Sequence, residues 1–557
     1  MHFLMSFYLM NLSILTIFFM IIFLMMKLNF LLEWMIFNFI SMKIEFIMYY
    51  DWITLMFIST IFLISSMVII YSIEYMNNDM YLKRFLMLIL IFIISMIYMI
   101  ISPNMISILM GWDGLGLSSY CLVIYYQNKK SFNAGMITIL MNRIGDICIL
   151  LMISILMIKG SWNFLFLNKL NNNFFMFILF ASISKSAQIP FSTWLPLAMA
   201  APTPISSLVH SSTLVTAGVY LLIRFNYLMN KEFYFYLMFL SCLTMFISGS
   251  SANFEYDLKK IIALSTLSQL GLMIFTISLN LPLLSFFHLI THAMFKSLLF
   301  LCSGIIIHNY FNNQDIRYIS LMNFNMPFIN MIFNMASLTL CGMPFLTGFY
   351  SKDFIIEMFN MKNNNKFMFY MMYLSMGLTL SYSFRLIFYI SIKPLKIMNF
   401  NLFNLKTMMI YSILTLMFMS MFYGSILNWL IFNSMNYIFL SMNLKILIYK
   451  YMILGFNLSI FSKMIMNMFL MKMNKQIIKF FNLMWFLPLN FKKMKFNIFL
   501  FNNNMIFLKD LGWLEYLSSK KKMFMVMKMN YLKKINYLNF LLLIMFTIYL
   551  INMIMYM

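Results

Sequence analysis

Residues 185–196 read KSAQIPFSTWLP, and they interrupt an apolar run that extends from 173 to 200. Pro190 removes a backbone donor and clashes with the preceding turn of a helix, so a helix cannot pass through this run unbroken. Lys185 stands directly before the interruption. The stretch therefore predicts a broken helix with a lysine beside the break.

A second apolar run, at 327–358, has the same feature. It contains CGMPFLTGFYSKD at residues 341–353, where Pro344 lies between two glycines and Lys352 follows. Interrupted apolar segments at corresponding places in two halves of a chain are typical of inverted-repeat transporters, whose ion sites lie near the midplane. Two unrelated proline kinks are the alternative interpretation.

The composition indicates a membrane protein. The chain has 557 residues, of which 63% are hydrophobic and 10% charged, whereas soluble domains have about 25% charged residues. Apolar runs of 18 or more residues recur along the chain, and each could cross about 30 Å of hydrocarbon as a helix. We expect an all-α polytopic membrane protein with about 15 transmembrane helices, near 7–27, 51–72, 84–101, 104–126, 131–158, 173–200, 204–225, 233–249, 258–278, 281–307, 327–358, 366–391, 408–432, 441–463 and 539–556.

The excess of positive charge is concentrated near the C-terminus. Residues 441–557 hold 16 lysines against two acids, Asp510 and Glu515. Basic patches often bind nucleic acid, but these alternate with apolar runs, which favours contact with anionic lipid headgroups and no nucleic-acid partner. Residues 465–536 are too polar to cross the bilayer and too apolar for a solvated tail, so they predict a lateral amphipathic helix along a membrane or partner surface.

Charged groups inside the apolar runs are the candidate functional residues. A charge at the bilayer centre costs at least ~2.5–3.5 kcal/mol, so each is a functional candidate. Histidine titrates near neutral pH, and buried lysines next to carboxylates can exchange protons. A series of such groups, bridged by water, predicts a proton path. The candidates are Asp113, Asp146, Lys185, His210, His288, His292, Lys296, Lys352 and Asp353.

Several of these residues have simpler interpretations. His210 could be a structural histidine, and Asp146 could form a static ion pair with Arg143. Lys352 lies near the end of its run, where a lysine can extend to water. His288 and His292 have the i, i+4 spacing of a zinc pair, but the Glu of a zinc-protease motif is missing. The five cysteines are scattered without a CxxC pair, so we expect no metal site.

At these residues the chain resembles the proton-translocating, antiporter-like subunits of respiratory complex I. The similarity runs from about residue 51 to 391 and includes GWDGLG (111–116), NRIGD (142–146), PTPISSLVHSSTLVTAGVYLLIRF (202–225), LKKIIALSTLSQLG (258–271) and THAMFKSLLFLCSGIIIHN (291–309). QDIR (314–317) and the basic stretch before a final span are more similar to the chain 5 group than to chains 2 and 4, and insect members of that group are similar in length and wording.

The resemblance implies a fold and roles for the candidates. It implies two inverted five-helix repeats with broken helices, and a lateral helix. Asp113 and Lys185 would form an acid–lysine pair, and His210 would pass the proton inward. His288, His292 and Lys296 would be the central link, with Lys352 and Asp353 on the exit side. Many relatives have Glu where Asp113 stands, so its contact with Lys185 would be longer or bridged by water.

The resemblance also implies a division of the chain and a set of partners. The chain would carry no FMN, iron–sulfur cluster or quinone, all of which belong to other parts of the complex, and its only ligand would be a phospholipid such as cardiolipin. Its partners would be chains 4 and 2, accessory subunits and lipids of the mitochondrial inner membrane. A stand-alone cation/proton antiporter and a purely structural anchor are the alternative functions.

The expected parts of the chain are N-terminal spans (1–103), two half-channel repeats (104–225 and 233–391), C-terminal spans (392–464), the lateral helix (465–536) and a final anchor (537–557).

Overall fold

A computed structural model gives the fold of this chain. It describes residues 2–38, 43–163, 172–320, 322–362, 365–393, 406–432, 438–469, 475–489 and Met545. Nearly all of these belong to one compact unit, residues 1–486. The predicted final span and most of the predicted lateral helix lie outside the described residues.

The N-terminal part contains one element that the sequence analysis did not predict. Helix α1 (His2–Met26) is followed by an antiparallel hairpin of β1 (Phe30–Asn38) and β2 (Lys43–Tyr50). Each apolar run in the hairpin is far shorter than a membrane span. The side-chain amide of Asn104 donates to the Glu45 carbonyl at 2.8 Å, which ties the hairpin to the start of α4.

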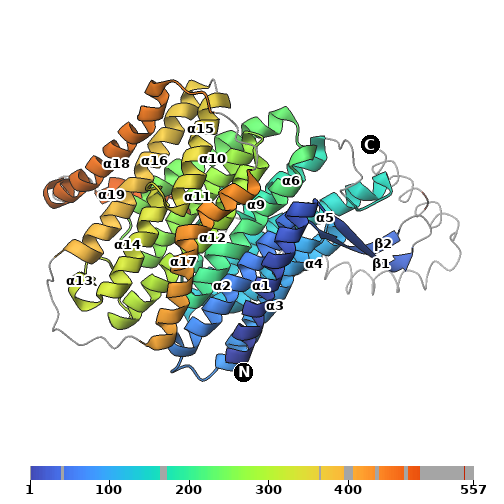
Figure 1. The fold of residues 1–557 in the computed structure, drawn as a ribbon, viewed down its shortest axis with the longest axis horizontal. Coiled ribbons are helices and arrows are strands. Elements are labelled where there is room, and N and C mark those ends of the chain that lie inside the picture. Colours follow the sequence, from blue (N-terminus) through green and yellow to red (C-terminus); the bar gives the residue numbers. More distant parts are fainter. Residues whose placement is uncertain are drawn as a thin grey trace, which may run out of the picture. The chain divides into compact units, whose positions relative to one another are not determined.

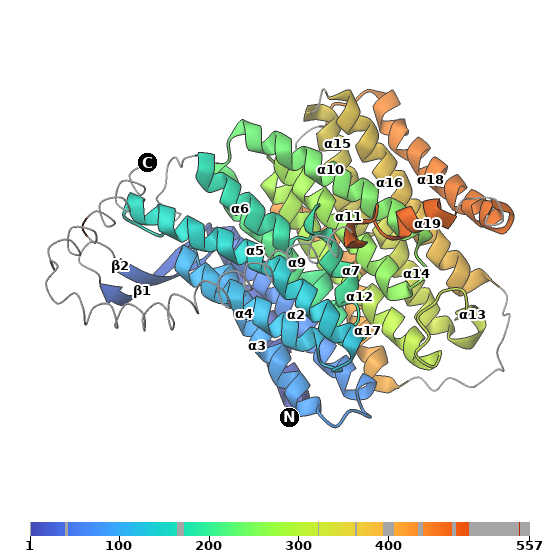
Figure 2. The same cartoon turned by 180° about the vertical axis from the view of Figure 1, so that it is seen from behind.

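The first half of the bundle surrounds one broken helix. α4, α5 and α6 lie side by side (Figure 2). The π-helical segment η2 lies between α8 and α9 and was not predicted. The elements are α2 (Trp52–Tyr75), α3 (Leu82–Ile101), α4 (Met105–Val123), α5 (Lys129–Lys159), α6 (Asn172–Lys185), η1 (Phe191–Thr193), α7 (Trp194–Ala198), α8 (Thr203–Ile205), η2 (Ser206–Thr213), α9 (Leu214–Arg224) and η3 (Asn226–Leu228).

The second half is built around α12, which packs against α2, η2, α11 and α17 (Figure 1). α10 packs on other helices of this half, α11 and α16. The elements are α10 (Lys231–Phe254), α11 (Leu258–Ser278), α12 (Pro282–Asn309), α13 (Met322–Asn325), α14 (Pro327–Cys341), α15 (Thr347–Lys362), α16 (Lys366–Ile387), η4 (Phe388–Ile392), α17 (Thr407–Ile431), α18 (Met442–Phe469) and α19 (Lys475–Asn482).

The predicted membrane spans agree with the described helices to within a few residues at most ends. Ten of these helices are long and apolar enough to cross a membrane, and two shorter apolar helices accompany them. Because this count covers only the described residues, it neither confirms nor contradicts the predicted total of about 15 transmembrane helices. α19 falls at the start of the predicted lateral segment.

Both helix breaks are confirmed. α6 ends at Lys185, and the chain passes through a cis peptide bond at Ile189–Pro190 before α7 begins. α14 ends at Cys341, where Gly342 adopts a left-handed conformation (φ 84°), and α15 begins at Thr347. Each break therefore exposes the last carbonyls of a helix inside the bundle, where they can accept hydrogen bonds.

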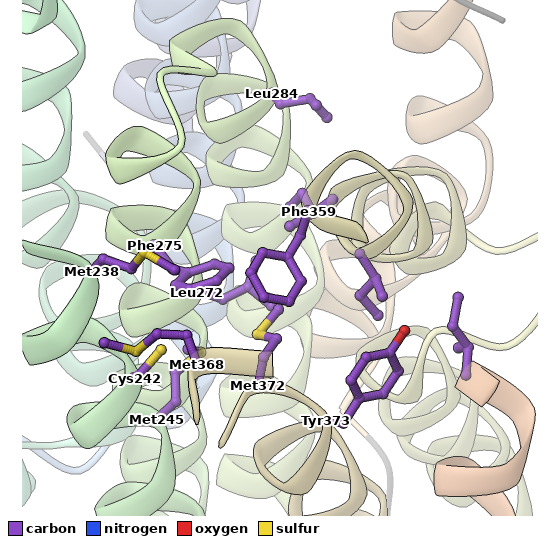
Figure 3. Packing of buried hydrophobic residues seen from close by; sticks show 13 residues of the cluster. Met238, Cys242, Met245, Leu272, Phe275, Leu284, Phe359, Met368, Met372 and Tyr373 are labelled. Atoms are coloured by element: carbon purple, nitrogen blue, oxygen red, sulfur yellow. The ribbon is translucent and has the colours of Figure 1, made fainter. Parts of the chain in front are cut away.

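A hydrophobic cluster holds the helices of the second half together. Phe275 of α11 packs edge-to-face on Phe359 of α15 at 5.0 Å between ring centroids. Figure 3 shows these rings with Met368 and Met372 of α16 beside them. Methionine side chains fill the irregular space between crossing helices because they are unbranched and flexible. This cluster fixes α15, and with it Lys352, against α11 and α16.

A buried ion pair joins the N-terminal spans to the first half. Asp51 caps the start of α2, where it accepts a hydrogen bond from the backbone N–H of Thr54 at 2.8 Å. Arg224, the last residue of α9, donates to both carboxylate oxygens of Asp51, at 2.6 and 2.7 Å. The Asp51 side chain is only 7% exposed. The pair therefore locks the ends of two helices that are distant in the sequence.

Arg224→Met is expected to leave the Asp51 carboxylate buried without its partner, which costs about 3–5 kcal/mol. The thermal midpoint of the assembled protein in mild detergent should fall accordingly. Arg317 forms a similar pair with Asp315 at 2.6 Å but is 52% exposed, so Arg317→Met should cost about 0–1 kcal/mol. Equal effects of the two substitutions would contradict the structural role of the buried pair.

Gly348→Ala is expected to prevent α15 from packing on α14. A Cβ atom at this position would lie 1.8 Å from the Thr339 carbonyl oxygen, and a backbone atom cannot move aside as a flexible side chain can. Overpacking of this kind costs at least about 1–3 kcal/mol. Gly377→Ala is the matched control, because its Cβ would meet the Tyr451 carbonyl oxygen at an ordinary 3.5 Å. Immunoblots of assembled complex should show loss of the first variant and retention of the second.

Candidate functional site

Lys185 is the last residue of α6 and is fully buried. Its Nζ donates to the backbone carbonyl oxygen of Trp112 at 3.2 Å and lies 4.8 Å from the centroid of the Trp112 ring. It forms no ion pair with a carboxylate in the described part of the chain. A carbonyl oxygen and an aromatic face therefore stabilise the ammonium, and neither carries a net charge.

The two candidate carboxylates of the first half, Asp113 and Asp146, both lie close to Arg143. The Trp112 indole N–H donates to Asp146 at 2.9 Å, and Arg143 pairs with Asp146 at 3.2 Å and with Asp113 at 3.8 Å. Asp113 and Lys185 form no ion pair within 4 Å in the described residues, so the longer or water-bridged contact expected of this pair stays a prediction.

His210 lies in the π-helical segment η2 and is 1% exposed. Its ring packs edge-on to Trp194 at 6.3 Å, and neither ring nitrogen has a hydrogen-bond partner among the described residues. A structural histidine would be expected to have such a partner when buried. π-Helical turns are often found at functional sites. The surroundings of His210 therefore favour a functional histidine.

The central group lies on one face of α12, as the four-residue spacing predicted. His288, His292 and Lys296 are fully buried. His288 contacts Ser351 of α15 at 2.9 Å and Gln269 of α11 at 3.2 Å, so it joins three helices. The His292 ring lies 6.2 Å from that of His288, and its nitrogens have no partner in the described protein. Lys296 donates to the Ser265 hydroxyl.

Lys352 and Asp353 lie in α15, just after the second break. Lys352 is 2% exposed and donates to the carbonyl oxygen of Leu340, one of the carbonyls released at the end of α14. It therefore does not extend to water, and the interpretation of Lys352 as a surface-seeking lysine is wrong. Asp353 is 8% exposed, and its Oδ1 has no hydrogen-bond partner among the described residues.

The sequence analysis missed several buried polar residues of the same kind. Trp112 belongs to the GWDGLG stretch, but an aromatic residue in an apolar run gives no signal of a polar role. Lys259 is 6% exposed and donates to the Ala201 carbonyl oxygen at 3.2 Å. Gln188 lies in the first break and accepts a hydrogen bond from Thr244 of α10 at 2.7 Å. Lys259 lies in the stretch 258–271 and Gln188 in the stretch 185–196. Because both are polar residues within apolar runs, the sequence could have marked them as candidate functional residues.

Three family models match the chain. Residues 34–86 match the N-terminus of NADH-ubiquinone oxidoreductase (complex I) chain 5. Residues 102–379 match the membrane domain of the NADH:quinone oxidoreductase/Mrp antiporter family. Residues 382–557 match the C-terminus of NADH dehydrogenase subunit 5. The last match includes the predicted lateral segment and final span.

Curated proteins and one solved structure are also similar. NADH-ubiquinone oxidoreductase chain 5 of Aedes aegypti is 52% identical over 453 residues, 79% of this chain and 78% of that protein. Its counterpart in Lumbricus terrestris is 41% identical over 84% of this chain and 83% of that protein. A chain of the Mrp complex from Dietzia sp. DQ12-45-1b has the same fold, with a TM-score of 0.69 at 19% identity over 86% of this chain. This chain spans 58% of that chain. By these matches, which cover about four fifths of its length at 41–52% identity, the chain belongs to the family of NADH-ubiquinone oxidoreductase chain 5.

Proposed function

We propose that this chain translocates protons as a membrane-arm subunit of H⁺-translocating NADH:ubiquinone oxidoreductase in the mitochondrial inner membrane. The observation that carries the proposal is the set of four fully or nearly buried lysines, each of which donates to a neutral oxygen. Their acceptors are the Trp112, Ala201 and Leu340 carbonyls and the Ser265 hydroxyl. A lysine with only neutral acceptors is not fixed as half of an ion pair, so it can both take up and release a proton.

The proposed path begins at the carboxylates of the first half. Asp113 and Asp146 lie close to Arg143, and the Asp113 side chain is 36% exposed, which gives protons access from outside the bundle. Trp112 connects Asp146 to Lys185 through its ring N–H and its carbonyl. A proton accepted at the carboxylates changes the field at Lys185, which then releases its own proton inward to His210.

The path continues along α12 to the second half. His292 has two free ring nitrogens in a fully buried place, and a neutral imidazole can accept a proton on one nitrogen and release one from the other. Lys296 follows one turn later. Two like charges in the same buried region repel, so a proton on Lys296 would favour release from Lys352 to Asp353.

The chain itself would carry no redox centre in this account. FMN, iron–sulfur clusters and ubiquinone would lie on other subunits, and a phospholipid such as cardiolipin would bind at the lipid-facing surface. The neighbouring antiporter-like chains 4 and 2 and accessory subunits are the proposed partners. Energy from the remote electron transfer would reach this chain through those contacts.

A stand-alone cation/proton antiporter is the second candidate, because the fold is shared with a chain of an Mrp complex. The match of residues 382–557 to the subunit 5 C-terminus favours the first candidate. Purification in mild detergent separates the two. Copurification with flavin- and iron–sulfur-containing subunits supports the complex I assignment, whereas an isolated, transport-active chain supports the antiporter.

Lys185→Met is expected to abolish proton pumping while the complex still assembles. Methionine fills the space of the lysine stem but cannot carry a proton. Lys185→Arg should fail as well, because arginine hardly ever releases its proton. The measurement is NADH-driven acidification in sealed vesicles, normalised to assembled complex. Normal pumping by an assembled Lys185→Met complex would contradict the carrier role and leave Lys185 a structural residue.

A further inference from the structure

An open cavity lies between strand β2 and the ends of helices α3 and α9, and its lining holds none of the proposed proton groups. Its volume open to the centre of a water molecule is about 240 Å³, many times the space that one water needs. The walls are mainly apolar, and they include Met99 and Ile101 of α3, Ile108 of α4 and Leu221 of α9. An apolar cavity with a few polar groups is the usual form of a small-molecule site.

The cavity lies where four membrane-spanning segments begin or end. α2 and α4 begin there, and α3 and α9 end there. All four belong to segments long and apolar enough to cross a membrane, so their shared end lies at a membrane surface. Tyr49, Tyr220 and Tyr227 line the cavity, and tyrosine is enriched at the boundary between membrane and water. A ligand at this level has its polar part in the headgroup region and its apolar part in the hydrocarbon.

An exposed apolar stripe on α3 leads to the cavity. Ile91, Ile94 and Tyr98 are 54%, 51% and 48% exposed. Their spacing of three and four residues places them on one face of the helix. Ile101 follows three residues later and lines the cavity. An acyl chain that lies along this stripe therefore has its polar end at the cavity.

The polar groups of the cavity have spare hydrogen-bond donors. Ser102 is 6% exposed, and its hydroxyl has no hydrogen-bond partner among the described residues. Arg224 donates from Nε to Tyr220 and from its two terminal nitrogens to Asp51, which uses three of the five N–H groups of a guanidinium. The charges of Arg224 and Asp51 offset each other. The cavity therefore suits a ligand with a neutral acceptor oxygen better than a free anion.

We propose that this cavity binds the glycerol ester group of a membrane glycerophospholipid, with one acyl chain along the α3 stripe. An ester carbonyl oxygen is a neutral acceptor for the spare donors of Ser102 and Arg224. The bound lipid fills the joint where β2 meets the ends of α3 and α9. This site gives a place and a recognised group to the phospholipid of the proposed function. It rests on the membrane location of the chain and not on proton translocation.

Phosphatidylcholine with a diazirine on its acyl chain, next to the ester, tests the proposal when titrated into the purified complex in mild detergent. Light should attach it to residues 99–108. Ile101→Trp puts a larger side chain at the mouth of the cavity and should lower this labelling several-fold. Ile453→Trp makes the same change at a 60% exposed position of α18 and should leave it unchanged. Labelling of residues 99–108 that is equal in the wild type and in Ile101→Trp would overturn the site.

Ser102→Ala is a milder variant that decides the matter even where Ile101→Trp does not assemble. Loss of the hydroxyl should raise the lipid concentration for half-maximal labelling roughly fivefold, the effect of one hydrogen bond. Ser95→Ala is the matched control, because the buried Ser95 of the same helix already donates to the Phe92 carbonyl oxygen at 2.8 Å. An unchanged half-maximal concentration for Ser102→Ala would contradict the proposed hydrogen bond.

The headgroup separates recognition of the ester from recognition of charge. The same photoreactive chain on cardiolipin, or as a free fatty acid, should label residues 99–108 no better than it does on phosphatidylcholine. Preferential labelling by either anionic form would overturn the ester assignment. Labelling reports occupancy of the cavity and not pumping. Normal pumping by Lys185→Met would therefore contradict the proposed function without affecting this site, so the two failures are distinguishable.

Discussion

The free energy of burying a charge in hydrocarbon determines how this chain is built. Placing an ammonium at the bilayer centre costs at least about 2.5–3.5 kcal/mol of free energy. The attraction within a buried ion pair offsets the cost of desolvation only when the geometry of the pair is good. The chain uses two different solutions. Asp51 and Arg224 form a close bidentate pair that fixes helix ends, whereas Lys185, Lys296 and Lys352 are held by neutral oxygens. The ion pair holds two helix ends rigidly together. A lysine with a neutral acceptor can still release its proton.

The second helix break provides one of those neutral oxygens. An unbroken α-helix uses most of its carbonyls internally, whereas the last carbonyls before a break are free to accept a hydrogen bond. α14 ends at Cys341, and the Leu340 carbonyl is then free to accept from Lys352. Lys185 stands at the last residue of α6 and reaches across to α4. In the second interrupted run the broken backbone therefore holds the buried ammonium directly, whereas in the first run Lys185 stands at the break and donates to a neighbouring helix.

The sequence predicted the parts that depend on local chemistry. Apolar length predicted the spans that fall on described helices, and proline, with glycine in the second run, predicted both breaks. The four-residue spacing of His288, His292 and Lys296 put them on one face of α12. The β1–β2 hairpin was not found, because apolar runs of eight or nine residues do not distinguish strands from loops. Trp112 was missed because its role comes from a tertiary contact between α4, α5 and α6, and the π-helical turn at His210 likewise depends on packing. The repeat boundaries and the assigned roles of the nine site residues stay predictions.

A high-resolution map of the assembled membrane arm, with ordered water visible, tests the central claim most directly. The account predicts water density that links Lys185 to His210, His292 to Lys296, and Lys352 to Asp353, with the lysine side chains directed into the bundle. Each gap would then be crossed by hydrogen bonds of ordinary length. Closely packed apolar side chains in these gaps, with no water between the named groups, would contradict a continuous proton path through this chain.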